Sequence, residues 1–204
     1  VIQYRSGARN DIKSLTDLVR KHGALMLWDA SHAVGAIEMD FDKNGVDIAV
    51  GCTYKYGNSG PGSPAWLYVN KKVQAQLQVP IQGWFSQGDQ FAMGPNFEKA
   101  EGIRGFQIAS PSLIGLRCIK SAFSMIEEAG IGAISEKAAI GTEMMIQLYD
   151  AWLADLGFTL LTSRNPQERG GHISLGHPDA DRICVALREF ADVIPDYRTP
   201  DSIR

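Results

Sequence analysis

The amino-acid sequence predicts an α/β fold, a sheet flanked by helices, followed by a small α+β unit. In the N-terminal region a helical pattern and three short apolar runs are arranged around a Gly-rich loop, an order typical of an α/β sheet. In the C-terminal region, long helical patterns precede short strand patterns. We place the boundary near Gly130, which gives one region of residues 1–130 and another of residues 131–204.

The N-terminal region begins with a predicted helix over residues 10–22, because apolar residues recur at helical spacing from Ile12 to Val19 and Gly23 follows. Three apolar runs are predicted to be strands, the first two of them buried and the first covered on both faces: residues 24–28, 46–50 and 65–69. The next stretch, residues 71–106, is rich in Gly, Gln and aromatic side chains without a clean period. It predicts a long irregular segment, a kind of segment that is often functional.

The remaining residues alternate between helix and strand patterns. Pro111 lies near the start of the first helical pattern, and Gly130 follows its end. We predict helices over residues 111–129, 134–156 and 179–190, and strands over residues 158–162, 172–175 and 193–197.

Composition and charge argue against several classes of protein. Apolar residues make up 45% and charged residues 21%, a balance typical of a soluble globular protein. The net charge of −3 comes without a Lys/Arg cluster, so we expect no nucleic-acid partner. No apolar run approaches the roughly 18 residues that a membrane span needs. Cys52, Cys118 and Cys184 form no CxxC pair, which favours a reducing cytoplasm. His172 and His177 flank an apolar strand without further ligands nearby, so we predict structural roles and no metal site.

The two ends of the sequence predict a fragment. The chain begins in mid-pattern at Val1 without an initiator Met, and it stops at Arg204 without an evident tail. We therefore expect it to belong to a longer protein.

A polar residue follows each of the first two predicted strands. Asp29 comes directly after residues 24–28, and Lys55 lies in the segment TYKY shortly after residues 46–50. Ligands of such sheets gather at the carboxyl ends of the strands. A nucleophilic lysine needs partial desolvation and a fixed position, which flanking tyrosines and a Gly-rich turn can supply. A pyridoxal phosphate enzyme also needs an anion beside the ring nitrogen of its cofactor.

Each of these residues also has an ordinary interpretation. Lys55 can be a solvated surface lysine, and Asp29 can be a helix cap or turn residue. His32, three residues after Asp29, can pack on a cofactor ring or be a structural histidine. An Asp after one strand and a Lys after the next is nevertheless the arrangement that pyridoxal phosphate chemistry requires.

Ordered segments along essentially the whole chain resemble the kynureninase family, pyridoxal phosphate enzymes of the class V aminotransferase-like group. They are WDASHAVG at 28–35, GCTYKY at 51–56, GPG at 60–62, GWF at 83–85, QFAM at 90–93 and DYRTP at 196–200, followed by Ile203 and Arg204. The resemblance implies a portion of the large-domain sheet of a fold-type I pyridoxal phosphate-dependent transferase-like enzyme. An incomplete small α+β C-terminal domain would follow it.

The resemblance also implies roles for individual residues around the cofactor. Lys55 would form an imine with pyridoxal phosphate and later shuttle protons, while Asp29 would pair with the pyridinium nitrogen. His32 would lie close to the cofactor. Tyr54 would bind the phosphate and act in proton transfer, and Trp84 would contact the phosphate region through its indole N–H.

Two further positions complete the implied site. Ser110 stands where the family carries an Asn or Thr near the cofactor, and its hydroxyl keeps donor and acceptor capacity. Arg204 would bind the substrate α-carboxylate, for which a bidentate guanidinium is well shaped. Without the resemblance, Arg204 is an ordinary solvated arginine.

The activity implied by the resemblance is hydrolysis of L-kynurenine to anthranilate and L-alanine, with 3-hydroxykynurenine as a related substrate. It implies a cytoplasmic homodimer in tryptophan catabolism and NAD biosynthesis. Two alternatives stay open. The chain can be a catalytically incomplete fragment that binds cofactor weakly, because the family's phosphate-binding loop and ring-stacking aromatic residue are not found in it. It can also belong to another class V-like enzyme, an aminotransferase or a desulfurase.

Overall fold

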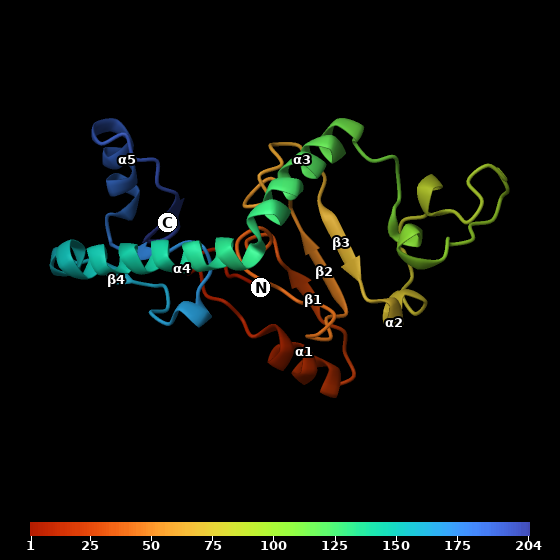
Figure 1. Cartoon of the computed structure of the whole chain (residues 1–204), viewed down its shortest axis with the longest axis horizontal. Helices are drawn as coiled ribbons and strands as arrows, with labels where there is room; N and C mark the ends of the chain where they lie inside the picture. The colour runs from red at the N-terminus through yellow and green to blue at the C-terminus, as the bar shows by residue number, and fades with distance from the viewer. The chain divides into compact units, whose positions relative to one another are not determined.

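A computed structural model describes all residues from 1 to 204, and the chain divides into two compact units (Figure 1). The sheet unit consists of Ile12–Ala30 and Asp40–Ser124. The C-terminal unit consists of Val1–Asp11, Ser31–Met39 and Met125–Arg204. The chain therefore passes between the units more than once, and the predicted domain limits 1–130 and 131–204 stay a prediction.

Three short strands form the sheet of the sheet unit, in the order β1-β2-β3: Leu27–Asp29, Ile48–Gly51 and Trp66–Val69. β1 and β2 are parallel, and Asp29 lies opposite Val50. β3 runs antiparallel to β2. The parallel pair brings the carboxyl ends of the first two strands to the same edge, as the sequence predicted.

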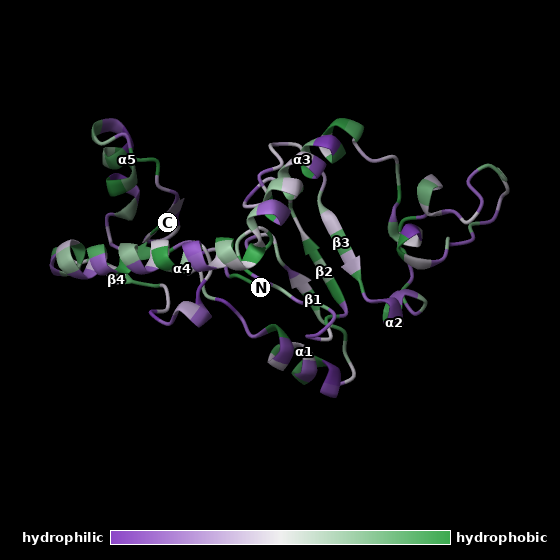
Figure 2. Cartoon of the chain, viewed as in Figure 1, coloured by the Kyte–Doolittle hydropathy of each residue, from purple (hydrophilic) through white to green (hydrophobic).

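Helix α1 (Ile12–Lys21) covers one face of this sheet. The indole N–H of Trp28 in β1 donates to Thr16 Oγ1 in α1 at 2.9 Å, and both residues are buried. Figure 2 shows that α1 is largely hydrophilic, which fits a helix that buries only a narrow stripe. The prediction that the first strand is covered on both faces is wrong for this chain. Leu27 points away from the Trp28 face and is 56% exposed, because successive side chains alternate.

The long segment after β3 is largely irregular, as predicted. It contains only short helical turns: α2 (Lys71–Gln74), η1 (Trp84–Ser86) and η2 (Gly102–Phe106). Helix α3 (Leu113–Ala129) follows, two residues later than predicted. Ser112 explains the later start, because its hydroxyl accepts a hydrogen bond from the backbone N–H of Gly115 at 3.1 Å, as an N-cap does.

The C-terminal unit combines helices with a small antiparallel sheet in the order β4-β5-β7-β6. Its helical elements are α4 (Ile131–Leu148), η3 (Tyr149–Leu153), η4 (Ala154–Leu156), η5 (Pro166–Glu168) and α5 (Ala180–Phe190). Its strands are β4 (Thr159–Leu160), β5 (Leu175–Gly176), β6 (Tyr197–Arg198) and β7 (Ser202–Ile203). No helix of either unit is both long enough and apolar enough to span a bilayer.

The strand predicted over residues 193–197 is wrong for most of its length, because β6 comprises only Tyr197–Arg198. Backbone hydrogen bonding begins at Asp196, and strand β6 itself starts at Tyr197, in a hairpin of β6 with β7 that was not predicted. Pro195 lacks a backbone N–H and disfavours pairing before that point. Two-residue strands are also too short to give a recognisable alternation.

Candidate active site

Asp29 and the loop that carries Lys55 lie at the same edge of the sheet. Asp29 is the last residue of β1, and Lys55 follows the end of β2 by four positions. Asp29 is exposed and Lys55 is half-buried. The Lys55 ammonium lies 5.4 Å from the ring centroid of Tyr54, which is itself half exposed. A primary amine, a carboxylate and a phenol thus come from the same edge of the sheet, and none of the three side chains is buried.

Hydrogen bonds of uncharged groups fix the backbone around Lys55. Thr53 is 1% exposed, and its hydroxyl donates to the carbonyl of Pro64 at 2.7 Å. The N–H of Asn58 donates to the carbonyl of Lys55 at 3.0 Å, and the N–H of Ser59 donates to the carbonyl of Thr53 at 3.1 Å. Lys55 therefore sits in a closed turn rather than in a free loop.

Small residues let helix α3 pack tightly against this turn. A Cβ at Gly57 would lie 2.5 Å from the carbonyl oxygen of Thr53 and 3.1 Å from the ring of Phe123 in α3. A Cβ at Gly115, also in α3, would lie 2.5 Å from Pro64. Only glycine fits at these two positions, so α3 and the Lys55 loop form one closely packed body.

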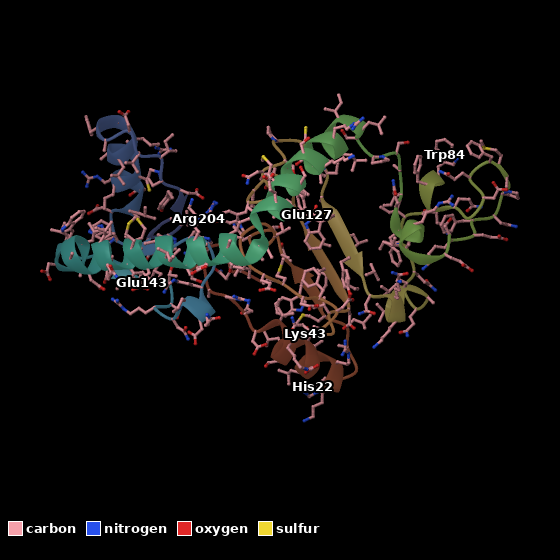
Figure 3. All side chains as sticks on the ribbon, viewed as in Figure 1. His22, Lys43, Trp84, Glu127, Glu143 and Arg204 are labelled. Atoms are coloured by element: carbon pink, nitrogen blue, oxygen red, sulfur yellow. The ribbon has the colours of Figure 1, made fainter.

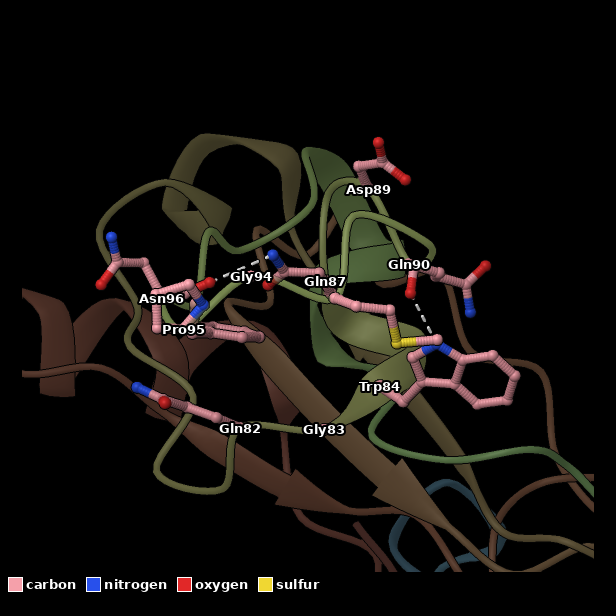
Figure 4. Close-up of a pocket in the computed structure, with 11 residues that line it drawn as sticks. Gln82, Gly83, Trp84, Gln87, Asp89, Gln90, Gly94, Pro95 and Asn96 are labelled. Carbon is pink, nitrogen blue, oxygen red and sulfur yellow. Dashed lines mark hydrogen bonds between the residues drawn. The ribbon is translucent and has the colours of Figure 1, made fainter.

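Trp84 and Ser110 lie in the same unit as Lys55, in its irregular segment. The indole N–H of Trp84 donates to the backbone carbonyl of Gln90 at 2.8 Å (Figure 4). Trp84 lines a shallow hollow of about 250 Å³, formed mainly by amide side chains and glycines between residues 82 and 97. Ser110 is exposed three residues before α3. The role predicted for Trp84 at the phosphate and the role predicted for Ser110 near the cofactor stay predictions.

His32 and Arg204 belong to the C-terminal unit. The rings of His32 and His172 lie 5.8 Å apart. The guanidinium of Arg204 donates to the carbonyl of Tyr4 at 2.7 Å and forms an ion pair with Asp196 (Figure 3 labels Arg204). Burial, and then the positive charge of Arg204, lower the pKa of His172 to about 4.

Two of these neighbours, Asp196 and Tyr4, were not predicted as site residues. Asp196 stands in the DYRTP segment, two residues before Arg198, so strand alternation could have placed both on one face. Tyr4 contributes a backbone carbonyl, which no sequence signal reveals. The Nδ1 of His177 accepts a hydrogen bond from the N–H of Asp179 at the start of α5, and its predicted structural role stays a prediction. No cluster of three or more potential metal-ligating His, Cys, Asp or Glu residues occurs in the structure.

The residues at the sheet edge fit pyridoxal phosphate by the chemistry of their donors. An amine can bond the aldehyde carbon, an accessible carboxylate can pair with a protonated ring nitrogen, and a phenol can donate to a phosphate. Lys55, Asp29 and Tyr54 supply these three groups within one unit. The tight turn around Lys55 also provides the fixed position that a nucleophilic lysine needs.

Structural comparison shows a shared fold. A cysteine desulfurase from Thermococcus onnurineus NA1 matches 96% of this chain and 47% of its own length, with 18% identity and a TM-score of 0.77. A variant of C-DES with glycine covalently linked to its PLP cofactor matches 99% of this chain and 53% of its own length, with 17% identity and a TM-score of 0.83. The predicted α/β fold of pyridoxal phosphate-dependent transferase-like enzymes is therefore confirmed.

Sequence comparison gives a narrower result. A kynureninase of Pseudomonas fluorescens is 34% identical over 203 residues, and one of Burkholderia mallei is 36% identical over the same length. In both cases the match covers 100% of this chain and 49% of the relative, so the chain spans about half the length of these curated relatives. Residues 134–204 match the model of the kynureninase C-terminal domain. The resemblance to the kynureninase family that the sequence motifs predicted is therefore confirmed along the whole chain.

Proposed function

We propose that the protein carrying this chain is a pyridoxal phosphate-dependent hydrolase that cleaves L-kynurenine to anthranilate and L-alanine. It would act on 3-hydroxykynurenine in the same way. The observation that carries the proposal is the parallel β1–β2 pair, which brings Asp29 and the Lys55 turn to one edge of the sheet. The similarity to kynureninases along the whole of this chain supports this reaction over the others known for the fold.

The cofactor, when bound, supplies an electron-accepting ring that stabilises negative charge at the substrate α-carbon. Asp29 holds the proton on the ring nitrogen, because a carboxylate beside a cation favours the charged form. The Lys55 amine would remove the proton from the substrate α-carbon and return one to the alanine product. The phenol of Tyr54 would donate a hydrogen bond to the cofactor phosphate, and it would exchange a proton beside Lys55. Addition of water to the substrate γ-carbonyl would allow the Cβ–Cγ bond to break. The aryl product would keep the γ-carbon as its carboxylate, and the three-carbon remainder would gain a proton to become alanine.

Arg204 binds the substrate α-carboxylate in this proposal. Its guanidinium is held by Tyr4 and Asp196 through two of its five N–H donors, which leaves three for a ligand. A guanidinium held in this way loses little conformational freedom when it binds a carboxylate. This supports a role for Arg204 in substrate recognition over that of a solvated arginine.

The two alternatives make different predictions. The structures of a desulfurase and a lyase share the fold at under 20% identity, so fold alone does not distinguish these reactions. The chain also spans only about half of its relatives, which favours a requirement for further residues in catalysis. A homodimer and a cytoplasmic location belong to the same proposal and rest on the family resemblance.

Covalent labelling tests the assignment of Lys55. The natural polypeptide that carries residues 1–204 is mixed with pyridoxal phosphate, treated with borohydride and digested for mass spectrometry. We expect the stable cofactor adduct on Lys55, loss of that adduct in Lys55→Gln, and retention of it in Lys43→Gln, which changes an exposed lysine of the same unit. An adduct on another lysine would refute the assignment.

Product analysis tests the reaction. The same polypeptide should release anthranilate from L-kynurenine, measured by fluorescence, and L-alanine in equal amount. Alanine from another substrate without any anthranilate would instead favour a desulfurase-like or transaminase-like reaction. Residues 1–204 alone should turn over far more slowly than the natural polypeptide, and equal rates would contradict the need for further residues.

A further inference from the structure

Three charged side chains lie on one face of the β6–β7 hairpin. Asp196 and Arg204 are directly opposite each other, because the N–H of each donates to the carbonyl of the other, at 2.9 and 3.0 Å. Arg198 lies two residues after Asp196 and therefore on the same face. Tyr197 and Ile203 alternate to the opposite face, where they pack with Ala180 and Cys184 of α5. The hairpin thus has an apolar face toward α5 and a charged face that carries Arg204.

The carboxylate of Asp196 is shared between two arginines. Its Oδ2 accepts a hydrogen bond from Arg198 Nη2 at 2.6 Å and another from Arg204 Nη2. Two guanidinium groups against one carboxylate leave one positive charge uncompensated. His172, the neighbouring titratable group, is neutral near pH 7 and leaves this excess unchanged. The cluster therefore carries a net positive charge, which attracts anions.

The first residues of the chain lie against the same cluster. The Tyr4 ring lies 5.8 Å from the Arg198 guanidinium, and the Tyr4 carbonyl accepts from Arg204 Nη1 at 2.7 Å. Arg204 is consequently fixed at both terminal nitrogens, and its side chain is only 17% exposed. Each terminal nitrogen uses one of its two N–H bonds in these contacts, so each retains one for a carboxylate.

We propose that Asp196 is a positioning residue for carboxylate recognition, which orients Arg204 while Arg198 keeps the shared pair net positive. The inference rests on the proposed role of Arg204 and extends it to two residues that do not bind the substrate themselves. Without Arg198, Asp196 would neutralise the charge of Arg204. Without Asp196, the side chain of Arg204 would be freer to adopt other rotamers. The shared carboxylate fixes the guanidinium and leaves its charge available.

The test compares a carboxylate with a neutral ligand. For each variant of the natural polypeptide, the KM for L-kynurenine is compared with the inhibition constant of kynurenine carboxamide, which lacks the negative charge of the α-carboxylate. The ratio of the two constants measures the preference for the carboxylate. In Asp196→Asn and in Arg198→Gln the preference for the carboxylate should fall about tenfold, the size of one charge-assisted hydrogen bond. The kcat should change much less than KM, because the lost contact acts on binding. Asp196→Glu and Arg198→Lys should restore some of the preference.

The controls separate the inference from the proposed function. Asp201→Asn changes an exposed aspartate of the same hairpin and should keep the preference. Arg204→Gln should abolish it, and an unchanged preference in this variant would overturn the role of Arg204. If Arg204→Gln loses the preference while Asp196→Asn and Arg198→Gln keep it, only the positioning inference is overturned. If Asp196→Asn does not fold by circular dichroism, Arg198→Gln, which retains the Asp196–Arg204 pair, decides alone.

Discussion

The Lys55 turn and the Arg204 hairpin hold their central residue in opposite ways. Lys55 is fixed by uncharged groups: the buried hydroxyl of Thr53, and glycines that allow α3 to pack closely. Arg204 is fixed by a charged contact: it pairs with Asp196, whose carboxylate also pairs with Arg198. Close packing of uncharged groups tolerates little added volume, but it depends little on salt and pH. Charged contacts tolerate changes of volume but respond to any change of charge.

The largest effect on stability should come from a buried charge of the C-terminal unit. Arg169 is 2% exposed, and it donates to Thr142 Oγ1 at 2.9 Å, to the Arg164 carbonyl at 2.5 Å and to Glu143 Oε2 at 2.8 Å (Glu143 is labelled in Figure 3). Arg169→Met removes all these donors and leaves their acceptors without them. We expect the free energy of unfolding to fall by about 3 kcal/mol in urea titrations followed by circular dichroism.

Arg164→Met is the matched control for Arg169→Met. Arg164 also pairs with a carboxylate, that of Asp150 at 2.6 Å, but both side chains are well exposed. An exposed pair contributes little, so the urea midpoint should barely move. Similar losses in the two variants would contradict the claim that burial makes the Arg169 contacts important.

A smaller effect should come from one added methyl group beside Lys55. Gly57→Ala places a Cβ 2.5 Å from the Thr53 carbonyl, and backbone cannot yield as a flexible side chain can. We expect a loss of about 2 kcal/mol in the free energy of unfolding, together with weaker cofactor attachment at Lys55 in the borohydride assay. Gly94→Ala is the control, since a Cβ there meets no atom within 4 Å. If Gly57→Ala behaves like Gly94→Ala, close packing does not fix the turn.

The sequence predicted the elements around Lys55 better than those around Arg204. Continuous apolar runs located β2 and β3, and a helical stripe located α1, because these elements bury enough side chains to leave a period. The hairpin of β6 and β7 has two-residue strands, so its pairing depends on tertiary contacts that no local pattern records. The contacts of Arg204 are similar, since its partner Tyr4 is 200 residues away along the chain.

The family motifs identified site residues that the periodicity of the sequence does not reveal. DYRTP identified the neighbourhood of Arg204 without showing that Arg198 and Arg204 share the carboxylate of Asp196, because that depends on which side chains face the same way. Likewise, GWF singled out Trp84 but not the hydrogen bond from its indole to the carbonyl of Gln90. Motifs of this kind identify residues, whereas the hydrogen-bond partners of those residues follow only from the three-dimensional structure.

The smallest predicted effect concerns pH and should appear in the C-terminal unit. Burial, followed by the charge of Arg204, lowers the pKa of His172 from 6.5 to about 4. On acidification the unfolded chain binds a proton near pH 6.5, whereas the folded chain binds it only near pH 4. The stability that neutral His172 provides is therefore complete above pH 6.5 and is lost as the pH falls toward 4. Because His172 is partly exposed, we expect a loss of about 1 kcal/mol rather than the full value of the shift.

His172→Gln isolates this contribution, because glutamine keeps hydrogen-bonding capacity but does not titrate. The drop in thermal midpoint between about pH 7.5 and pH 5 should be a few degrees smaller in this variant than in the unmodified protein. His22→Gln, which changes an exposed histidine of the sheet unit, should leave the drop unchanged. Equal drops in all three proteins would mean that His172 is protonated in the folded state at pH 5. The charge excess around Arg204 would then include His172 at that pH, and carboxylate binding should strengthen on acidification rather than stay constant.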